Sequence, residues 1–369
     1  MKFTSSIFVL LVQFLMLNCS GDNDSINIPV DIEEEIALDN PPDLTIKVDP
    51  RIELLAVVQH FTTWAEKNHT KFNIGYKYEI DNYFTNYKNH SAVQKSQALT
   101  DAGFIYDAPV AFVLYHSNPP DFEQIVPYSD YLIKRAGGES NLKDFAEKLR
   151  SFANETNFMK FFESKRKFYN HLQNEIIRNI GDVNYIKILE NYYGKKKHSY
   201  NIIPAPLFHS GGYGAKVLND TDEDIYNITG PKSYSNGNLT FGDKDDILYI
   251  LLHEFSHSFI NDITEKYSAE INKLKSLYEP IKEKMMLQGY SNWQSCVNEH
   301  LVRAVVARIT LQLIGEFYKE LIIKNEISNG FIYISKLDLI LSEYENNRNQ
   351  YPNFESFYPR IIELFNSLI

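Results

Sequence analysis

Cysteine is scarce in this sequence, and its scarcity excludes one way of stabilising a domain. The 369-residue chain has two cysteines, Cys19 and Cys296. Two cysteines cannot build the disulfide framework that holds many small secreted domains together. A single bond between two residues so far apart in the chain would need close and specific geometry. We therefore interpret Cys296 as a small, buried hydrophobic residue.

Basic residues are also in deficit. The chain has 37 Lys and Arg against 48 Asp and Glu, a formal net charge of −11. This excess of negative charge repels polyanions, which disfavours nucleic acid and anionic lipid as general partners and leaves only a local basic patch open. Internal repeats and low-complexity segments are absent as well. Hydrophobic residues make up 44% of the chain and aromatic residues 14%, which predicts a globular protein with a substantial core.

The apolar run near the start of the chain is short. It extends from Ile7 to Leu17 after a charged Lys2, which is too short to span a bilayer comfortably and is typical of a signal peptide. Residues 16–19 resemble a lipobox, in which the chain is cut before a cysteine that receives lipid. Residues 20–24 resemble the acidic export tag of surface lipoproteins of Bacteroidota. We expect residues 1–18 to be a lipoprotein signal peptide and Cys19 to anchor the chain to the outer membrane of the cell envelope, facing the cell surface or the periplasm. An ordinary cleaved signal peptide and an uncleaved anchor are the alternatives.

The next segments predict a tether and then one domain. Residues 19–43 are acidic and contain Pro41 and Pro42, which favours a flexible link. Residues 44–369 are expected to form a single domain, with a helical first part at 44–198 and a sheet followed by further helices at 199–369. Asp49 and Pro50 follow a short strand and have the pattern of a helix start. Apolar residues at three- and four-residue spacing then predict helices at residues 51–65, 77–88, 141–152, 157–179 and 183–193.

Strand-like runs separated by turn signals occupy residues 199–241. Runs rich in strand-favouring residues, such as 201–203 and 226–228, alternate with turns such as Gly211-Gly212 and Asn236-Gly237, which predicts a small antiparallel sheet. Helical periodicity returns at residues 245–260, 265–286, 293–324, 335–346 and 354–368. The pattern is that of an α+β fold, mainly helical, whose sheet precedes the helix with the most distinctive motif.

That motif is HExxH, at residues 253–257, within an apolar and helix-compatible run. Four residues advance a helix by slightly more than one turn, so His253 and His257 lie on one face and can bind the same zinc ion. Glu254 is expected to be the catalytic base, taking a proton from the attacking water and delivering it to the leaving amine. An accidental motif would leave two histidines and a carboxylate buried in an apolar helix without a partner.

A catalytic zinc ion needs a third protein ligand. Ile260 and Ile263 stand where the metzincin extension would place a glycine and a third histidine, so this ligand must come from elsewhere. The candidates are Glu299, early in a later apolar-periodic helix, its neighbour His300, and Glu270.

These residues together resemble a gluzincin-type zinc metallopeptidase, in which a glutamate from a later helix completes the HExxH site. Glu299, followed by Arg303 and Ala304, matches that arrangement, so the resemblance implies Glu299 as the third ligand in preference to His300 or Glu270. With the opening residues 48–55, the chain from about 44 to 368 is more closely similar to a family of Bacteroidota lipoproteins catalogued as a domain of unknown function. The gluzincin resemblance implies peptidase activity with one bound zinc ion. It also implies that an edge strand before the zinc helix pairs with the extended substrate.

Four further residues are candidates for contact with the substrate or its oxyanion: His209, Tyr213, Tyr226 and Arg303. Sheet packing or surface placement is the alternative for the first three. Arg303, one turn after Glu299, could instead orient that carboxylate or simply pair along its helix. Asn261, one turn after His257, could support that ligand or cap the helix.

The sequence thus predicts an extracytoplasmic zinc-dependent hydrolase, most directly a metallopeptidase that cleaves a peptide or protein substrate by attack of zinc-bound water. A second enzymatic hypothesis keeps this chemistry for another amide, such as a peptidoglycan cross-link. The non-enzymatic alternative is a cell-surface binding lipoprotein with a structural or vestigial metal site. Glu254 argues against it, because a purely structural site has no use for a base beside its ligands.

Overall fold

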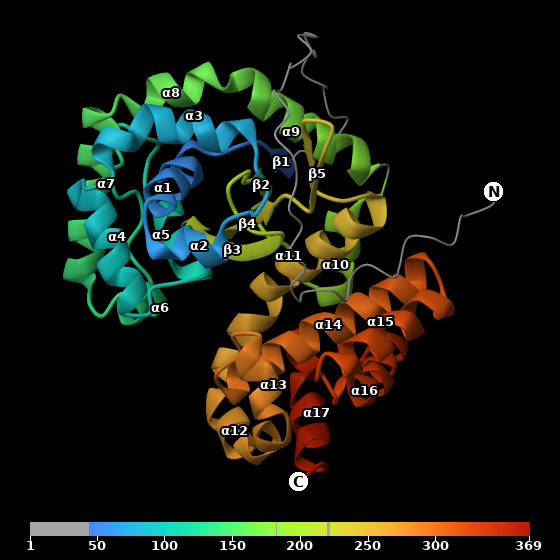
Figure 1. The fold of residues 1–369 in the computed structure, drawn as a ribbon. Coiled ribbons are helices and arrows are strands. Elements are labelled where there is room, and N and C mark those ends of the chain that lie inside the picture. Colours follow the sequence, from blue (N-terminus) through green and yellow to red (C-terminus); the bar gives the residue numbers. More distant parts are fainter. Residues whose placement is uncertain (1–43, 182, 220–221) are drawn as a thin grey trace.

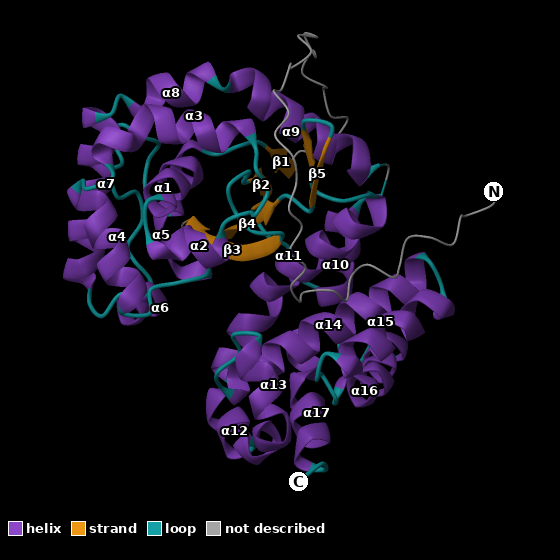
Figure 2. Cartoon of the chain, in the orientation of Figure 1, coloured by secondary structure: helices purple, strands orange, loops and turns teal. Residues whose placement is uncertain are grey.

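A four-stranded mixed sheet lies between two groups of helices (Figure 1 and Figure 2). The computed structural model describes residues 44–181, 183–219 and 222–369, so the predictions for Cys19 and residues 1–43 lie outside the described residues. The sheet has the order β1-β2-β4-β3, and β5 and β6 form a separate hairpin. The strands are β1 (Leu44–Ile46), β2 (Ser199–Pro204), β3 (Gly211–Asn219), β4 (Asp222–Gly230), β5 (Ser233–Ser235) and β6 (Asn238–Thr240).

The predicted α+β class, mainly helical, is confirmed, but the predicted strand direction is wrong in part. β3 and β4 are antiparallel, as are β5 and β6, whereas β1 runs parallel to β2 and β2 runs parallel to β4. The long helical segment between β1 and β2 returns the chain to the same end of the sheet, which is what a parallel pair requires. Alternation of apolar residues specifies the two faces of a strand and not its direction.

Of the helices between β1 and β2, α1 to α9 lie around one side of the sheet, whereas α10 packs against α11 (Figure 1). α1 begins at Pro50, where the Asp49 side chain accepts a hydrogen bond from the Arg51 amide and caps the helix, as the sequence predicts. Three of the helices, α4, α5 and α6, were not predicted, and two predicted helices are each split in two. The elements are α1 (Pro50–His60), α2 (Thr63–Asn68), α3 (Gly75–Phe84), η1 (Thr85–Tyr87), α4 (Ser91–Asp101), α5 (Asp107–Leu114), α6 (Asp130–Arg135), α7 (Glu139–Glu155), α8 (Phe158–Ser164), α9 (Arg166–Ile180) and α10 (Tyr185–Tyr193).

The helices after the sheet form a second group, which α11 joins to the sheet (Figure 1). α11 contacts both β3 and α14. The predicted helix at residues 293–324 is broken at Gly315, which has φ +115°, a conformation that glycine adopts readily and other residues rarely. The elements are α11 (Lys244–Lys266), α12 (Ser268–Lys273), η2 (Lys275–Ile281), α13 (Lys282–Leu287), α14 (Trp293–Leu313), α15 (Glu316–Ser328), α16 (Ile334–Asn346) and α17 (Phe354–Asn366).

Buried hydrophobic residues of both groups form one continuous cluster, to which the sheet and α11 also contribute. Cys296 is part of it and is a free, fully buried thiol, which confirms its interpretation as a small hydrophobic residue. In the part of the chain that the structure describes, no helix is both long and apolar enough to span a membrane.

Candidate metal centre

The site begins with α11, a 23-residue helix that carries the HExxH motif. The Asp243 side chain accepts hydrogen bonds from the amides of Asp245 and Asp246, and the Asp246 side chain accepts one from the Asp243 amide, which makes a capping box. This device satisfies amides that a helix start otherwise leaves unpaired. The start of α11 is therefore well defined. His253 and His257 lie farther along the same helix, on one of its faces.

Three side chains from two helices converge where the sequence predicts a zinc site. His253 and His257 come from α11 and Glu299 from α14, and their candidate ligand atoms all lie within 4.8 Å of one another. The two Nε2 atoms are 3.3 Å apart, Glu299 Oε1 is 3.4 Å from His257 Nε2, and Glu299 Oε2 is 3.7 Å from His253 Nε2. Tetrahedral zinc with bonds of about 2.0–2.1 Å places neighbouring ligand atoms about 3.3 Å apart. The three side chains therefore fit one zinc ion.

The electrostatics of the group also suit a cation. Burial and the charge of Arg303 hold the pKa of His253 well below its ordinary value, so this imidazole is neutral, as a metal ligand must be. Burial opposes charge on the Glu299 carboxyl, but Arg303 and the two histidines outweigh burial and lower its pKa to about 2. The group thus presents a negative charge at Glu299 and a neutral imidazole at His253.

The two alternative third ligands lie elsewhere. His300, the residue after Glu299, is fully buried, and its Nδ1 contacts the Cys296 carbonyl oxygen at 2.7 Å. Its ring packs against the rings of Phe331 and Tyr333 and not among the ligands. Glu270 is exposed on α12. Neither belongs to the cluster of candidate ligands among the described residues, so the geometry favours Glu299.

Glu254 lies beside the ligands and against strand β3. β3 is an edge strand of the sheet, and the Gly214 amide donates a hydrogen bond to the Glu254 carboxylate. A Cβ at Gly212 would lie 2.8 Å from Glu254 Cγ, and one at Gly214 would lie 2.8 Å from the Glu254 carbonyl oxygen, so only glycine allows this approach. Burial raises the pKa of the Glu254 carboxyl to about 7, a value suited to a general base.

The two glycines are functional candidates that the sequence analysis missed as such. It treated Gly212 as a turn signal and Gly214 as part of a strand. The run Gly-Gly-Tyr-Gly at residues 211–214 was the available signal, because glycine within a strand often marks a place where another backbone or a ligand approaches closely.

Asn261 supports a ligand. Its Oδ1 lies 3.3 Å from Nδ1 of His257, and α11 continues beyond it to Lys266, so Asn261 does not end the helix. An oxygen partner at Nδ1 fixes the ring orientation and leaves Nε2 as the metal-binding nitrogen.

The structure does not bring Tyr213 or Tyr226 to the ligands. Tyr213 lies between Gly212 and Gly214, and successive side chains of a strand point to opposite faces, so its ring is on the face away from Glu254. His209 Nε2 contacts the Tyr213 hydroxyl at 2.8 Å. Tyr226 pairs with Ala215 in the β3–β4 ladder and its hydroxyl interacts with Arg51.

Arg303, in contrast, does reach the site. Its guanidinium forms an ion pair with Glu299 Oε2 and retains 12% side-chain exposure. This contact matches the predicted alternative in which Arg303 orients the carboxylate. A guanidinium already engaged by a buried carboxylate is poorly placed to bind substrate.

One comparison with known proteins found a match. A family model described as Domain of unknown function (DUF4932) matches residues 44–364. The chain belongs to this family. Searches of curated proteins and of solved structures found no match. The family description carries no activity, so the chemistry of the DUF4932 domain must be argued from its site.

Proposed function

We propose that this protein is a zinc-dependent hydrolase, and specifically a metallopeptidase with one zinc ion held by His253, His257 and Glu299. The observation that carries the proposal is the convergence of these three side chains at tetrahedral spacing, with Glu254 adjacent to them. A structural zinc site normally has four protein ligands, whereas a catalytic site has three and an open position. The described residues supply three.

Glu254, Gly214 and the edge of β3 would each have a separate role in the reaction. Zinc, when bound, acidifies water and polarises the scissile carbonyl. Glu254 accepts the proton of the attacking water and delivers it to the leaving amine, and the Gly214 amide holds its carboxylate in place. Among the described residues β3 has a strand partner on one side only, so an extended peptide can add to the sheet on its other side. This geometry favours a peptide or protein substrate over a compact amide.

We further propose that the enzyme acts in the cell envelope, anchored by lipid at Cys19 to the outer membrane. This rests on the signal-peptide pattern of residues 1–18 and on the acidic residues after it. The net charge of −11 supports the absence of nucleic acid among the partners.

Metal content and turnover together test the function. We expect about one zinc per wild-type chain by elemental analysis, and a sharp loss in both His253→Ala and Glu299→Ala. Glu254→Gln should keep its zinc and lose activity on a broad peptide library by a factor of about 10² to 10⁴. His300→Gln, altered one residue from Glu299, is the matched control and should keep both. A wild-type chain without zinc would refute the proposal.

Substrate assays separate the remaining hypotheses. Cleavage of purified cell wall but not of peptides would identify a peptidoglycan cross-link as the target amide. Zinc binding without turnover on either material would instead favour a binding lipoprotein with a structural or vestigial site.

A further inference from the structure

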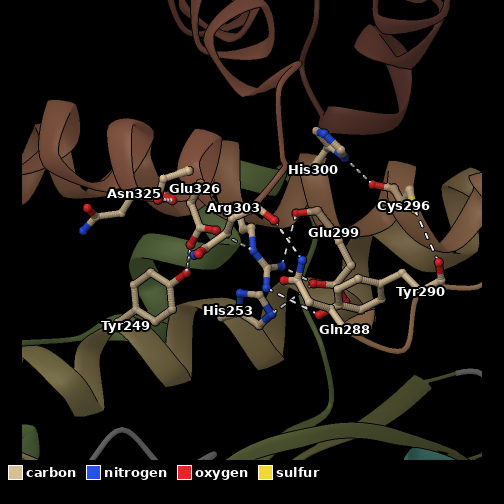
Figure 3. Close-up of polar contacts among 12 residues, drawn as sticks. Tyr249, His253, Gln288, Tyr290, Cys296, Glu299, His300, Arg303, Asn325 and Glu326 are labelled. Atoms are coloured by element: carbon tan, nitrogen blue, oxygen red, sulfur yellow. Dashed lines mark hydrogen bonds and ion pairs between the residues drawn. The ribbon is translucent and has the colours of Figure 1, made fainter. Parts of the chain in front are cut away.

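A network of buried polar contacts extends from Arg303 to Glu326 and Tyr249 (Figure 3). Arg303 Nε donates to Oε2 of Glu326 on α15 at 3.1 Å. The other oxygen of Glu326 accepts a hydrogen bond of 2.8 Å from the hydroxyl of Tyr249 on α11. Neither Glu326 nor Tyr249 belongs to the group of candidate ligands. The contacts therefore connect α14 to α15 and α15 to α11.

This network of contacts returns to the metal site through Tyr249. Tyr249 precedes His253 by one turn of α11, and the two rings stack with centroids 5.9 Å apart and an interplanar angle of 23°. Figure 3 shows Tyr249, Glu326 and Arg303 in sequence around His253 and Glu299. His253 thus stacks with Tyr249, and Glu299 is held by Arg303.

The side chains of this network have little contact with solvent. The side chains of Glu299, Arg303 and Glu326 are each only 10–12% exposed, and the Phe331 ring covers the guanidinium with its centroid 4.1 Å from Cζ. Burial makes an unpaired charge costly, so each member depends on its neighbour. Two carboxylates share one guanidinium, which leaves one net negative charge beside the histidines, suited to a divalent cation.

The geometry points to a positioning role for this network: we propose that Glu326 and Tyr249, acting through Arg303, orient Glu299 for metal binding. The guanidinium is planar, and its donors form a rigid fork. Glu326 holds the Nε side of the fork, so Nη1 is directed at Glu299 Oε2. Glu299 Oε1 then remains on the side of His257 Nε2, 3.4 Å away. Residues that hold a ligand in this way typically change metal affinity 10- to 100-fold when they are removed.

This inference rests on the proposed metal site, but its test needs no substrate. The affinity of the purified full chain for zinc alone would be measured by competition with a chromophoric chelator. Glu326→Gln keeps the shape of the side chain and removes its charge, and we expect it to weaken zinc binding 10- to 100-fold. Tyr249→Phe keeps the ring on His253 and should weaken binding less. Glu320→Gln, on the same helix with 60% side-chain exposure, is the control and should bind like the wild type.

A double-mutant cycle distinguishes positioning from general support of the fold. In an Arg303→Gln background, Glu326→Gln should cause less than a twofold further loss, because Glu326 acts through Arg303. The visible spectrum of Co²⁺, bound in place of zinc, should change in Glu326→Gln, since it reports ligand geometry. If Glu326→Gln fails to fold, Tyr249→Phe carries the same test.

The outcomes separate this inference from the proposed function. Wild-type zinc binding with unchanged affinity in Glu326→Gln and Tyr249→Phe would overturn the inference and leave the metal site standing. An equal loss with and without Arg303 would also overturn it, because Glu326 would then act by another route. A wild-type chain that binds no zinc would overturn both.

Discussion

At the scale of single residues, the closest packing in the site is between a carboxylate and two glycines. Glu254 lies against Gly212 and Gly214 with no space for a Cβ at either position. The strand comes this near because it has no side chains on that face at those two residues. The position of the catalytic base thus depends on residues that contribute only backbone.

Gly212→Ala should therefore impair catalysis more than metal binding. The new Cβ would lie 2.8 Å from Glu254 Cγ, which displaces the carboxylate, whereas the zinc ligands are not touched by it. We expect normal zinc content with kcat reduced about tenfold or more. Gly75→Ala, where a Cβ meets nothing within 4 Å, is the control and should have wild-type kcat. Loss of zinc in Gly212→Ala would show that the strand supports the ligands themselves.

Glu53 belongs to the opening segment at residues 48–55, far from the metal ligands in sequence. It is fully buried, and its Oε2 accepts a hydrogen bond of 2.5 Å from Tyr76, whose hydroxyl also contacts that of Tyr169. Its Oε1 has no partner among the described residues. Burial raises the pKa of the Glu53 carboxyl to about 7 from an ordinary 4.5.

This shift predicts that Glu53 lowers stability as pH rises. Between pH 4.5 and 7 the folded chain binds a proton that the unfolded chain has lost, so the free energy of unfolding falls across that window, by about 3 kcal/mol in total. Glu53→Gln, which is always neutral, should be more stable than wild type at pH 8 by up to about that amount and similar to it below pH 4.5. Urea unfolding at several pH values measures this. The exposed Glu147→Gln should follow the wild-type pH dependence, and a Glu53→Gln curve parallel to wild type would contradict the prediction.

At the scale of elements, α11 is the helix on which the site depends, because it carries two ligands, the base and Tyr249. Its start is held by the Asp243 capping box rather than by burial, since Asp243 is exposed. The cap is about 15 Å from His253, at 1.5 Å per residue over ten residues. Stability of the helix and geometry of the site can therefore be varied separately.

Asp243→Ala should lower the free energy of unfolding by about 1 kcal/mol, because the amides of Asp245 and Asp246 lose their acceptor. Zinc affinity should stay near that of the wild type, since no ligand moves. Asp243→Ser retains a good capping side chain and should recover most of the loss. Chemical denaturation and zinc competition provide the two measurements. A large loss of zinc affinity in Asp243→Ala would mean that α11 does not behave as a rigid element.

At the scale of the whole molecule, the metal ligands connect α11, the helix that joins the second group to the sheet, with α14 inside that group. His253 and His257 lie on the helix that packs on the sheet, and Glu299 lies on α14 in the second group. A bound ion would therefore strengthen a connection between parts that are 42 or more residues apart in sequence, 299 against 257.

Zinc should accordingly raise the melting temperature of the wild-type chain. Binding to the folded state alone stabilises it by about 4 kcal/mol when free zinc is 1,000 times Kd. A chelator should reverse the shift, and His253→Ala should show neither effect. Differential scanning calorimetry with and without zinc measures this, and an identical shift in His253→Ala would assign it to a different site.

The sequence by itself determined the parts of this protein that depend on local spacing. A four-residue interval in a helix places His253 and His257 on one face whatever surrounds them. Strand-favouring runs between turn signals predicted β2 and β4, and apolar residues at three- and four-residue spacing predicted most of the longer helices. The helix start at Asp49 and Pro50 also follows from local chemistry. The mainly helical α+β class followed from the sum of these local patterns.

Only the tertiary structure decided how those parts meet. Glu299 and His300 are adjacent on α14, and which of them faces α11 depends on the rotation of one helix against another, because consecutive helical residues point about 100° apart. Strand direction depended on the connections between strands. The approach of Gly212 to Glu254 and the contact of Glu326 with Arg303 join residues 42 and 23 positions apart. Long-range packing of this kind leaves no periodic signal in a single sequence, because it is set by the fit of whole surfaces.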